Sequence, residues 1–186
     1  MTNELFFVAL EPPSPQFEML SQLKQDVALK FDVKHSLKSP PHITIVPPFR
    51  FSDNQMNDII HHLQLCLFRS SHCIRIYLEG YGHFRQKVVF VKVRTTKKLI
   101  DFQQRLVRCL YANSKLPVKN ELTRSFYPHL TLAHRDVTFE KFKKIMAYLK
   151  SRPIKLTFDI CELTLYKYNS TKSQWESVEK LPFKKN

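Results

Sequence analysis

Hydrophobic positions recur along the chain with two different spacings, which predict an alternation of strands and helices. Apolar residues three or four positions apart predict helices over residues 17–31, 56–67, 99–110 and 139–149. Short apolar runs predict strands over residues 6–10, 43–46, 73–80, 88–93, 129–133, 154–160 and 163–168, with a further candidate at 175–178. The pairs Pro40-Pro41 and Pro47-Pro48 are expected to bound the strand at 43–46, and Thr138 is expected to cap the last helix.

The order of these elements repeats within the chain. Strand, helix, strand, helix, strand is found twice, approximately over residues 4–84 and 86–169. No linker rich in Gly and Ser separates the halves, so we expect a single bilobal domain over residues 1–186 that arose by internal duplication. The short strands are expected to be antiparallel in part, which indicates the α+β class. A cleft between two lobes is a common place for a ligand site.

One short motif occurs once in each half. Pro41-His42-Ile43-Thr44-Ile45 and Pro128-His129-Leu130-Thr131-Leu132 follow the same pattern. Side chains alternate between the two faces of a strand, so each histidine shares a face with the threonine of its own motif. The aliphatic residues between them then point to the core. We expect two imidazoles and two hydroxyls to face one another across one cleft.

Such a set of groups suits phosphoester chemistry. Histidine titrates near neutral pH, so one imidazole can accept a proton while the other donates one. Threonine hydroxyls can donate hydrogen bonds to the charged oxygens of a phosphate. The remaining histidines and the cysteines lack the spacing of a metal site, so we expect no metal and no cofactor.

Charge and composition narrow the choice of ligand. Thirty Lys and Arg residues against 16 Asp and Glu give a formal net charge of +14, which favours a polyanion such as RNA. A solubilising surface charge is the alternative. The only glycines are Gly80 and Gly82, which excludes a Walker loop, a dinucleotide-binding fingerprint and a kinase Gly-rich loop.

The cysteines and the N-terminal residues bear on the compartment. The four cysteines show no paired spacing and are expected to be buried or half-buried thiols in a reducing compartment. The N-terminal apolar run is too short for a secretion signal or a membrane span. We therefore expect a cytoplasmic protein with no membrane partner.

The paired motifs resemble those of the 2H phosphoesterases, and within them the 2′-5′ RNA ligase-like group of RNA 2′,3′-cyclic phosphodiesterases. The resemblance covers roughly the whole chain. It includes the segment Gly80-Tyr81-Gly82-His83-Phe84 with the strand that follows it, and the ending Leu163-Thr164-Leu165-Tyr166. It implies two pseudo-symmetric lobes of antiparallel sheet with outer helices around a central cleft.

The resemblance also implies an activity and roles for the motif residues. It implies a monomeric hydrolase that opens 2′,3′-cyclic phosphates at RNA ends to 2′-phosphates, with reversible 2′-5′ ligation as a further activity of such proteins. His42 is then the proton donor and His129 the acceptor, with Thr44 and Thr131 binding the phosphate.

Two further residues are candidates for substrate binding. By strand alternation, Arg135 lies on the face of His129 and Thr131 and could bind phosphate; a solvated arginine at the strand end is the alternative. Phe84 could stack a base at the cleft mouth, or else belong to the core. The pair Phe126-Tyr127 is open to the same two interpretations.

Two other functions remain open from the sequence. The same site could act on a small cyclic nucleotide or on a 2′-5′ phosphodiester. The chain could also be a basic RNA-binding module without catalysis, although both motifs keep their histidine and threonine.

Overall fold

The computed structural model describes residues 3–52, 56–67, 72–113 and 125–183. The helices are α1 (Gln16–Phe31), α2 (Met56–Leu67), α3 (Lys97–Asn113) and α4 (Phe139–Lys150), with a short 3₁₀ helix η1 (His35–Lys38). The strands are β1 (Asn3–Leu10), β2 (Ile43–Ser52), β3 (Ile74–Phe84), β4 (Val88–Val93), β5 (His129–His134), β6 (Lys155–Ile160), β7 (Glu162–Asn169) and β8 (Gln174–Pro182). The predicted helices and strands are therefore confirmed, including the last strand. The loop expected over 115–126 lies largely outside the described residues.

All eight strands form one antiparallel sheet with the order β6-β3-β4-β5-β2-β1-β7-β8. The order is symmetric about the central β5–β2 pair. The last strand of the first half, β3, pairs with β4, and β7 of the second half pairs with β1. Each half of the chain thus contributes its final strand to the opposite side of the sheet. The α+β class expected from the sequence is confirmed.

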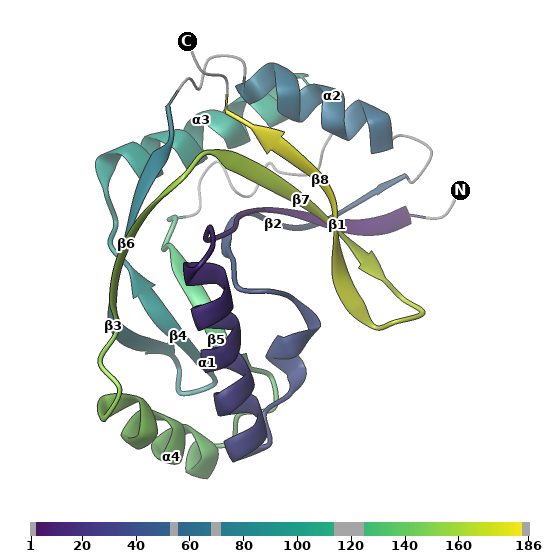
Figure 1. The fold of residues 1–186 in the computed structure, drawn as a ribbon. Helices are drawn as coiled ribbons and strands as arrows, with labels where there is room; N and C mark the ends of the chain where they lie inside the picture. Colours follow the sequence, from purple (N-terminus) through teal and green to yellow (C-terminus); the bar gives the residue numbers. More distant parts are fainter. Residues whose placement is uncertain (1–2, 53–55, 68–71, 114–124, 184–186) are drawn as a thin grey trace.

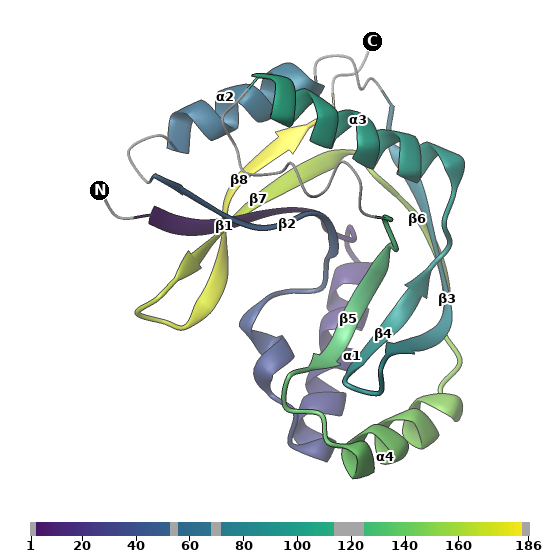
Figure 2. The same ribbon diagram turned by 180° about the vertical axis from the view of Figure 1, so that it is seen from behind.

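The helices cover the strongly curved sheet in two pairs (Figures 1 and 2). Helices α1 and α4 contact each other, and α1 packs on β5. Helices α2 and α3 pack together at the other end, where α3 contacts β2 and α2 contacts β8. Each pair combines one helix from each half of the chain, so the helices follow the same symmetry as the strands.

Two strands are longer than the sequence predicts. We expected the first motif strand to stop before Pro47, but β2 runs through Pro47 and Pro48 to Ser52. The register shows why: Phe6 lies opposite Phe49 and Val8 opposite Val46, so Phe7 alone faces both prolines. A β-bulge tolerates residues without an N–H group. Strand β3, which we expected to end near Gly80-Tyr81-Gly82, continues to Phe84, with Gly80 at φ +69° beside a register shift.

The cysteine prediction is wrong for all four residues. Cys66 on α2 and Cys109 on α3 form one disulfide, and Cys73 and Cys161 form another. Their Cα atoms lie 5.6 and 4.3 Å apart, respectively. The expected free thiols are therefore absent at these four positions. Disulfides are rare in reducing compartments, so the pairing weighs against the expected reducing compartment. The cytoplasmic location stays a prediction. Among the described helices, none is long and apolar enough to span a membrane.

Reducing the two disulfides is expected to destabilise the fold. They close segments with sequence separations of 43 and 88 residues, and a cross-link of this kind stabilises by about 2–4 kcal/mol, mainly by restricting the unfolded chain. Urea unfolding of the oxidised protein, the reduced protein and a Cys66→Ser/Cys109→Ser variant measures each contribution. Equal unfolding free energies with and without reductant would show that the thiols are not bridged.

Candidate active site

The two motifs meet where the halves of the sheet join. Strands β2 and β5 are antiparallel, with Ile43 opposite Leu130. This register places His42 level with Thr131, and Thr44 level with His129. Ile43 and Leu130 are fully buried, whereas the histidines and threonines are half-buried. The alternation expected from the sequence therefore holds, and each histidine stands beside the threonine of the other motif.

Two adjoining hollows lie over this strand pair. One, of about 450 Å³, is lined by His42, Thr44 and Thr131 together with several basic residues. The other, of about 430 Å³, is lined by His129, Thr44 and a group of aromatic residues. Thr44 and Pro48 line both hollows. A ligand at their junction can therefore reach all four motif residues.

Each motif histidine is oriented by the same kind of hydrogen bond. His42 Nδ1 lies 2.8 Å from the carbonyl oxygen of Pro40, and His129 Nδ1 lies 2.8 Å from the carbonyl oxygen of Tyr127. A carbonyl oxygen only accepts, so Nδ1 carries the proton in both rings. Nε2 is then the nitrogen of each ring that remains for proton exchange with a substrate.

Both imidazoles are held in the neutral form when no anion is bound. Burial lowers the pKa of His42 to about 3, and the positive charge of Lys24 acts in the same direction. Burial also lowers the pKa of His129, and the hydrogen bond to the Tyr127 carbonyl offsets part of this effect by raising it. A phosphate bound between the rings would raise both pKa values, because an adjacent negative charge favours the imidazolium.

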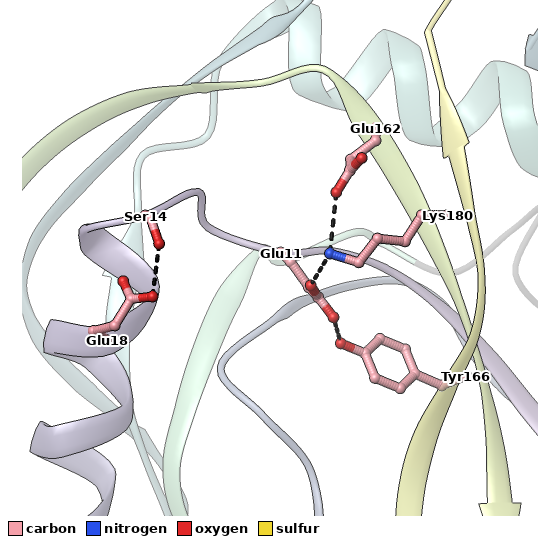
Figure 3. Close-up of polar contacts among 6 residues, drawn as sticks. All are labelled: Glu11, Ser14, Glu18, Glu162, Tyr166 and Lys180. Atoms are coloured by element: carbon pink, nitrogen blue, oxygen red, sulfur yellow. Dashed lines mark hydrogen bonds and ion pairs between the residues drawn. The ribbon is translucent and has the colours of Figure 1, made fainter.

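Aromatic rings back each histidine. The Phe7 ring centroid lies 4.8 Å from that of His42 and is stacked on Tyr166 at 4.5 Å. Figure 3 shows Glu11 between Tyr166 and Lys180: the Tyr166 hydroxyl donates to the Glu11 carboxylate, and Lys180 Nζ lies 2.9 Å from it. The His42 ring thus rests on a packed layer that is anchored by an ion pair.

The second histidine has a matching support. The ring centroids of Phe84 and Phe90 lie 5.0 and 5.2 Å from that of His129. A Cβ atom at Gly82 would lie 2.5 Å from the Phe90 ring, so glycine is needed there for Phe90 to keep its place. Phe84 is half-buried, contacts His129 and lines the aromatic hollow with Tyr127, so it does not belong to the buried core. Its stacking on a base stays a prediction.

A buried lysine, which the sequence did not single out, lies beside His42. Lys24 on α1 is 3% exposed and lines the larger hollow. Its Nζ donates to the carbonyl oxygens of Ser39 at 2.8 Å and Pro40 at 3.4 Å. The Pro40 oxygen therefore accepts from both Lys24 and His42. Burial lowers the pKa of Lys24 to about 7.

Replacing Lys24 with methionine is expected to remove the part of the pH dependence of the unfolding free energy that is due to the Lys24 ammonium group. The folded protein releases the Lys24 proton near pH 7, whereas the unfolded chain keeps it up to about pH 10. The unfolded state binds more protons in this range, so the unfolding free energy of the wild type should rise with pH relative to that of Lys24→Met. Urea unfolding at pH 6.5 to 9.5 measures this difference. Parallel curves for the two proteins would contradict it.

A β-bulge in β5 alters the expected position of Arg135. Val89 pairs with Ala133, but Phe90 pairs with Thr131, so Leu132 is an extra residue. Ala133 is consequently buried, and His134, not Arg135, is the half-buried residue that ends the strand. The alternation argument for Arg135 is therefore wrong. Arg135 lies one residue beyond β5 with φ +70° and still lines the larger hollow.

Several lining residues carry no signal in the sequence. Lys24, His35, Lys38 and Trp175 come from α1, η1 and β8 and meet only through the packing of these elements. Trp175 contacts Phe7 and also lines the hollow. Within the described ranges, no three His, Cys, Asp or Glu side chains gather in a way that could hold a metal ion.

Comparison of the sequence with known proteins identifies a family. The model of the 2′-5′ RNA ligase superfamily matches residues 12–172. A protein of Bacillus licheniformis, named provisionally as a phosphoesterase, is 23% identical over 138 residues, which cover 71% of this chain and 76% of the relative.

Solved structures share the fold. TT0787 of Thermus thermophilus superposes with a TM-score of 0.69 at 17% identity, covering 98% of this chain and 99% of that protein. E. coli LigT complexed with phosphate gives a TM-score of 0.61 at 16% identity, with both chains fully covered. E. coli LigT complexed with 3′-AMP gives 0.62 at 16% identity, covering 98% and 99%. Since the family model spans most of the sequence, the chain belongs to the 2′-5′ RNA ligase superfamily of 2H phosphoesterases.

Proposed function

We propose that this phosphoesterase hydrolyses 2′,3′-cyclic phosphates at RNA ends to 2′-phosphates by general acid–base catalysis between His42 and His129. The observation that carries the proposal is the matched pair of Nδ1–H···O=C bonds. These bonds fix the same tautomer in both rings and leave the two Nε2 atoms to exchange protons with one phosphate bound between strands β2 and β5. The net charge of +14 supports a polyanionic RNA substrate over a small cyclic nucleotide with a single charge.

The reaction follows from this arrangement. His129 Nε2 takes a proton from water as the water oxygen attacks phosphorus. With the anionic phosphate bound, His42 is in the imidazolium form and carries a proton on Nε2 as well as on Nδ1. The P–O3′ bond breaks on the opposite side, and His42 gives the Nε2 proton to the leaving O3′. The product carries a 2′-phosphate and a 3′-hydroxyl, and the proton has passed from His42 to His129 by way of the reactants. The hydroxyls of Thr44 and Thr131 donate to the non-bridging oxygens, where charge accumulates.

The aromatic hollow offers a place for the base next to the phosphate. It is lined by Phe84, Phe126, Tyr127 and Pro48 beside His129. Tyr127 is 55% exposed and lies edge-on to Phe84, with ring centroids 5.4 Å apart. Exposed aromatic rings are stacking surfaces for unpaired bases, with little preference for sequence.

A substrate assay tests the proposal. Purified protein in EDTA is given RNA with a 2′,3′-cyclic phosphate end, adenosine 2′,3′-cyclic phosphate, and a 2′-5′ linked dinucleotide. Chromatography then resolves the 2′- and 3′-monophosphate products. We expect cleavage of the cyclic phosphates to the 2′-phosphate. Cleavage confined to the 2′-5′ linkage would replace the proposed substrate, and loss of activity in EDTA with recovery on adding a divalent ion would falsify the metal-free mechanism.

Replacing Tyr127 with alanine is expected to weaken binding of the base and leave the chemistry intact. Stacking contributes about 1–3 kcal/mol per base, so KM for adenosine 2′,3′-cyclic phosphate should rise at least ~5-fold with little change in kcat. Tyr111→Ala, which removes another exposed tyrosine, on α3, is the matched control. The same rise in KM for a cyclic phosphate of glycerol, which has no base, would argue against stacking.

A further inference from the structure

The larger hollow extends well beyond the two catalytic motifs. Its far end is lined by His35 and Lys38 of η1, by His134 at the end of β5, and by Arg135 just after it. The aromatic hollow lies at the opposite end of β5, beside His129. The site is therefore elongated along β5, with aromatic rings at one end and basic groups at the other.

The basic end is not neutralised by the protein. Of the described residues that line this hollow, none is acidic, and six are Lys, Arg or His. Lys38 and Arg135 form no ion pair with any carboxylate in the described ranges. Burial lowers the pKa of His134 to about 4, and the neighbouring His35 and Arg135 act in the same direction. The positive charges of Lys38 and Arg135 therefore favour an anion bound among these groups, to which the imidazoles can donate hydrogen bonds.

Hydrogen bonds between distant segments hold this end in place. Ser36 is 1% exposed, and its Oγ donates to the carbonyl oxygen of Leu132 at 2.6 Å. The His35 amide donates to Asp136 Oδ2 at 2.7 Å, which ties the nearest acidic group to the backbone. The His35 and His134 rings lie edge to face, 4.9 Å apart. The walls from η1 and β5 are thus joined before any ligand arrives.

Backbone strain marks the same place. Arg135 has φ +70°, a conformation that non-glycine residues adopt rarely and that persists where the surrounding structure imposes it. The bulge at Leu132 turns His134 toward the face that carries Thr131. His134 lies three residues beyond Thr131, on the order of 10 Å along the strand. A nucleoside with phosphates on both sides of its ribose can bridge such a span.

We propose that His35, Lys38, His134 and Arg135 form a subsite for a second phosphate, the one on the 5′ oxygen of the nucleoside whose 2′,3′-phosphate lies between the catalytic histidines. This inference rests on the proposed function for the position of the first phosphate. It assigns the substrate class more narrowly: the protein recognises a terminal nucleotide that is phosphorylated on its 5′ side, as at an RNA end, over a bare cyclic nucleoside.

Binding measurements test the subsite without requiring catalysis. Calorimetry compares adenosine 2′-monophosphate with adenosine 2′,5′-bisphosphate, which differ only in the second phosphate. We expect the bisphosphate to bind about 10- to 100-fold more tightly at low salt, as suits charge-assisted hydrogen bonds from two cations. Lys38→Met and Arg135→Asn should each shrink this ratio at least ~5-fold. Asparagine is chosen because it tolerates positive φ.

A control and a second assay separate the outcomes. Lys144→Ala removes one positive charge from the exposed face of α4 and should leave the ratio of the two dissociation constants unchanged. Equal affinities of the wild type for the two ligands would overturn the subsite. The same ratio of dissociation constants in Lys38→Met, Arg135→Asn and Lys144→Ala would overturn it as well. Hydrolysis is followed separately with RNA that carries a 2′,3′-cyclic phosphate end: its absence would overturn the proposed function and leave the binding result to decide the subsite.

Discussion

Replacing either His42 or His129 with alanine is expected to lower kcat for a 2′,3′-cyclic phosphate at least ~10²-fold, the usual contribution of a general acid or base. Each ring is fixed by a hydrogen bond from Nδ1 to a carbonyl oxygen and rests against aromatic rings. Among the described residues, His129 is the only imidazole that lines the aromatic hollow, and the other imidazoles of the larger hollow, His35 and His134, lie outside the two motifs. Neither loss should therefore be compensated by a neighbouring group.

The measurement is single-turnover hydrolysis of adenosine 2′,3′-cyclic phosphate by each variant. His61→Ala, which removes an exposed histidine from α2, serves as the matched control and should retain wild-type activity. The two histidines act on one phosphate, so the double variant should lose little more than the worse single variant. Losses below ~10-fold in both single variants would remove the pair from the chemistry.

Thr44→Val and Thr131→Val are expected to lower kcat by about 10- to 100-fold each, since one hydrogen bond to a charged group contributes about 1.5–3 kcal/mol. Valine keeps the shape of threonine and its β-branching, so β2 and β5 should fold as before. The register places each threonine level with the histidine of the other motif. The two substitutions should therefore have similar effects.

Thr44→Ser and Thr131→Ser keep the hydroxyl and provide the comparison. They should retain most of the activity if the hydroxyl binds the phosphate oxygens. Serine variants as impaired as the valine variants would mean that the methyl group, and so the packing of the strand, is what matters at these positions.

The sequence predicted the motif faces because strand alternation is a local property. His42, Thr44, His129 and Thr131 share one face, and the aliphatic residues between them are buried, as expected. The family resemblance and the α+β fold were predictable for the same reason: they depend on short motifs and on the order of elements. The symmetric exchange of β3 and β7 depends on long-range pairing, which no local pattern encodes.

Where the predictions failed, a distant partner changed a local rule. Pro47 and Pro48 continue β2 because Phe7 of β1 allows a bulge. His134 takes the position on the strand that we expected for Arg135, because Val89 and Phe90 of β4 pair with Ala133 and Thr131 and leave Leu132 unpaired. The disulfides join cysteines with sequence separations of 43 and 88 residues, and Lys24 reaches His42 through the packing of α1. Each of these contacts becomes visible only in three dimensions.

The pH dependence of kcat tests the acid–base pair most directly, because kcat reports the enzyme–substrate complex, in which the bound phosphate favours the imidazolium. In EDTA, with adenosine 2′,3′-cyclic phosphate, we expect a bell-shaped profile, because one imidazole must be neutral and the other protonated. With His129 as base, His129→Ala should lose the fall toward acid pH, and with His42 as acid, His42→Ala should lose the fall toward alkaline pH. The opposite assignment of the two limbs would exchange the roles of the histidines. A wild-type rate that climbs steadily from acid to alkaline pH, with no fall, would contradict general acid catalysis and with it the proposed mechanism.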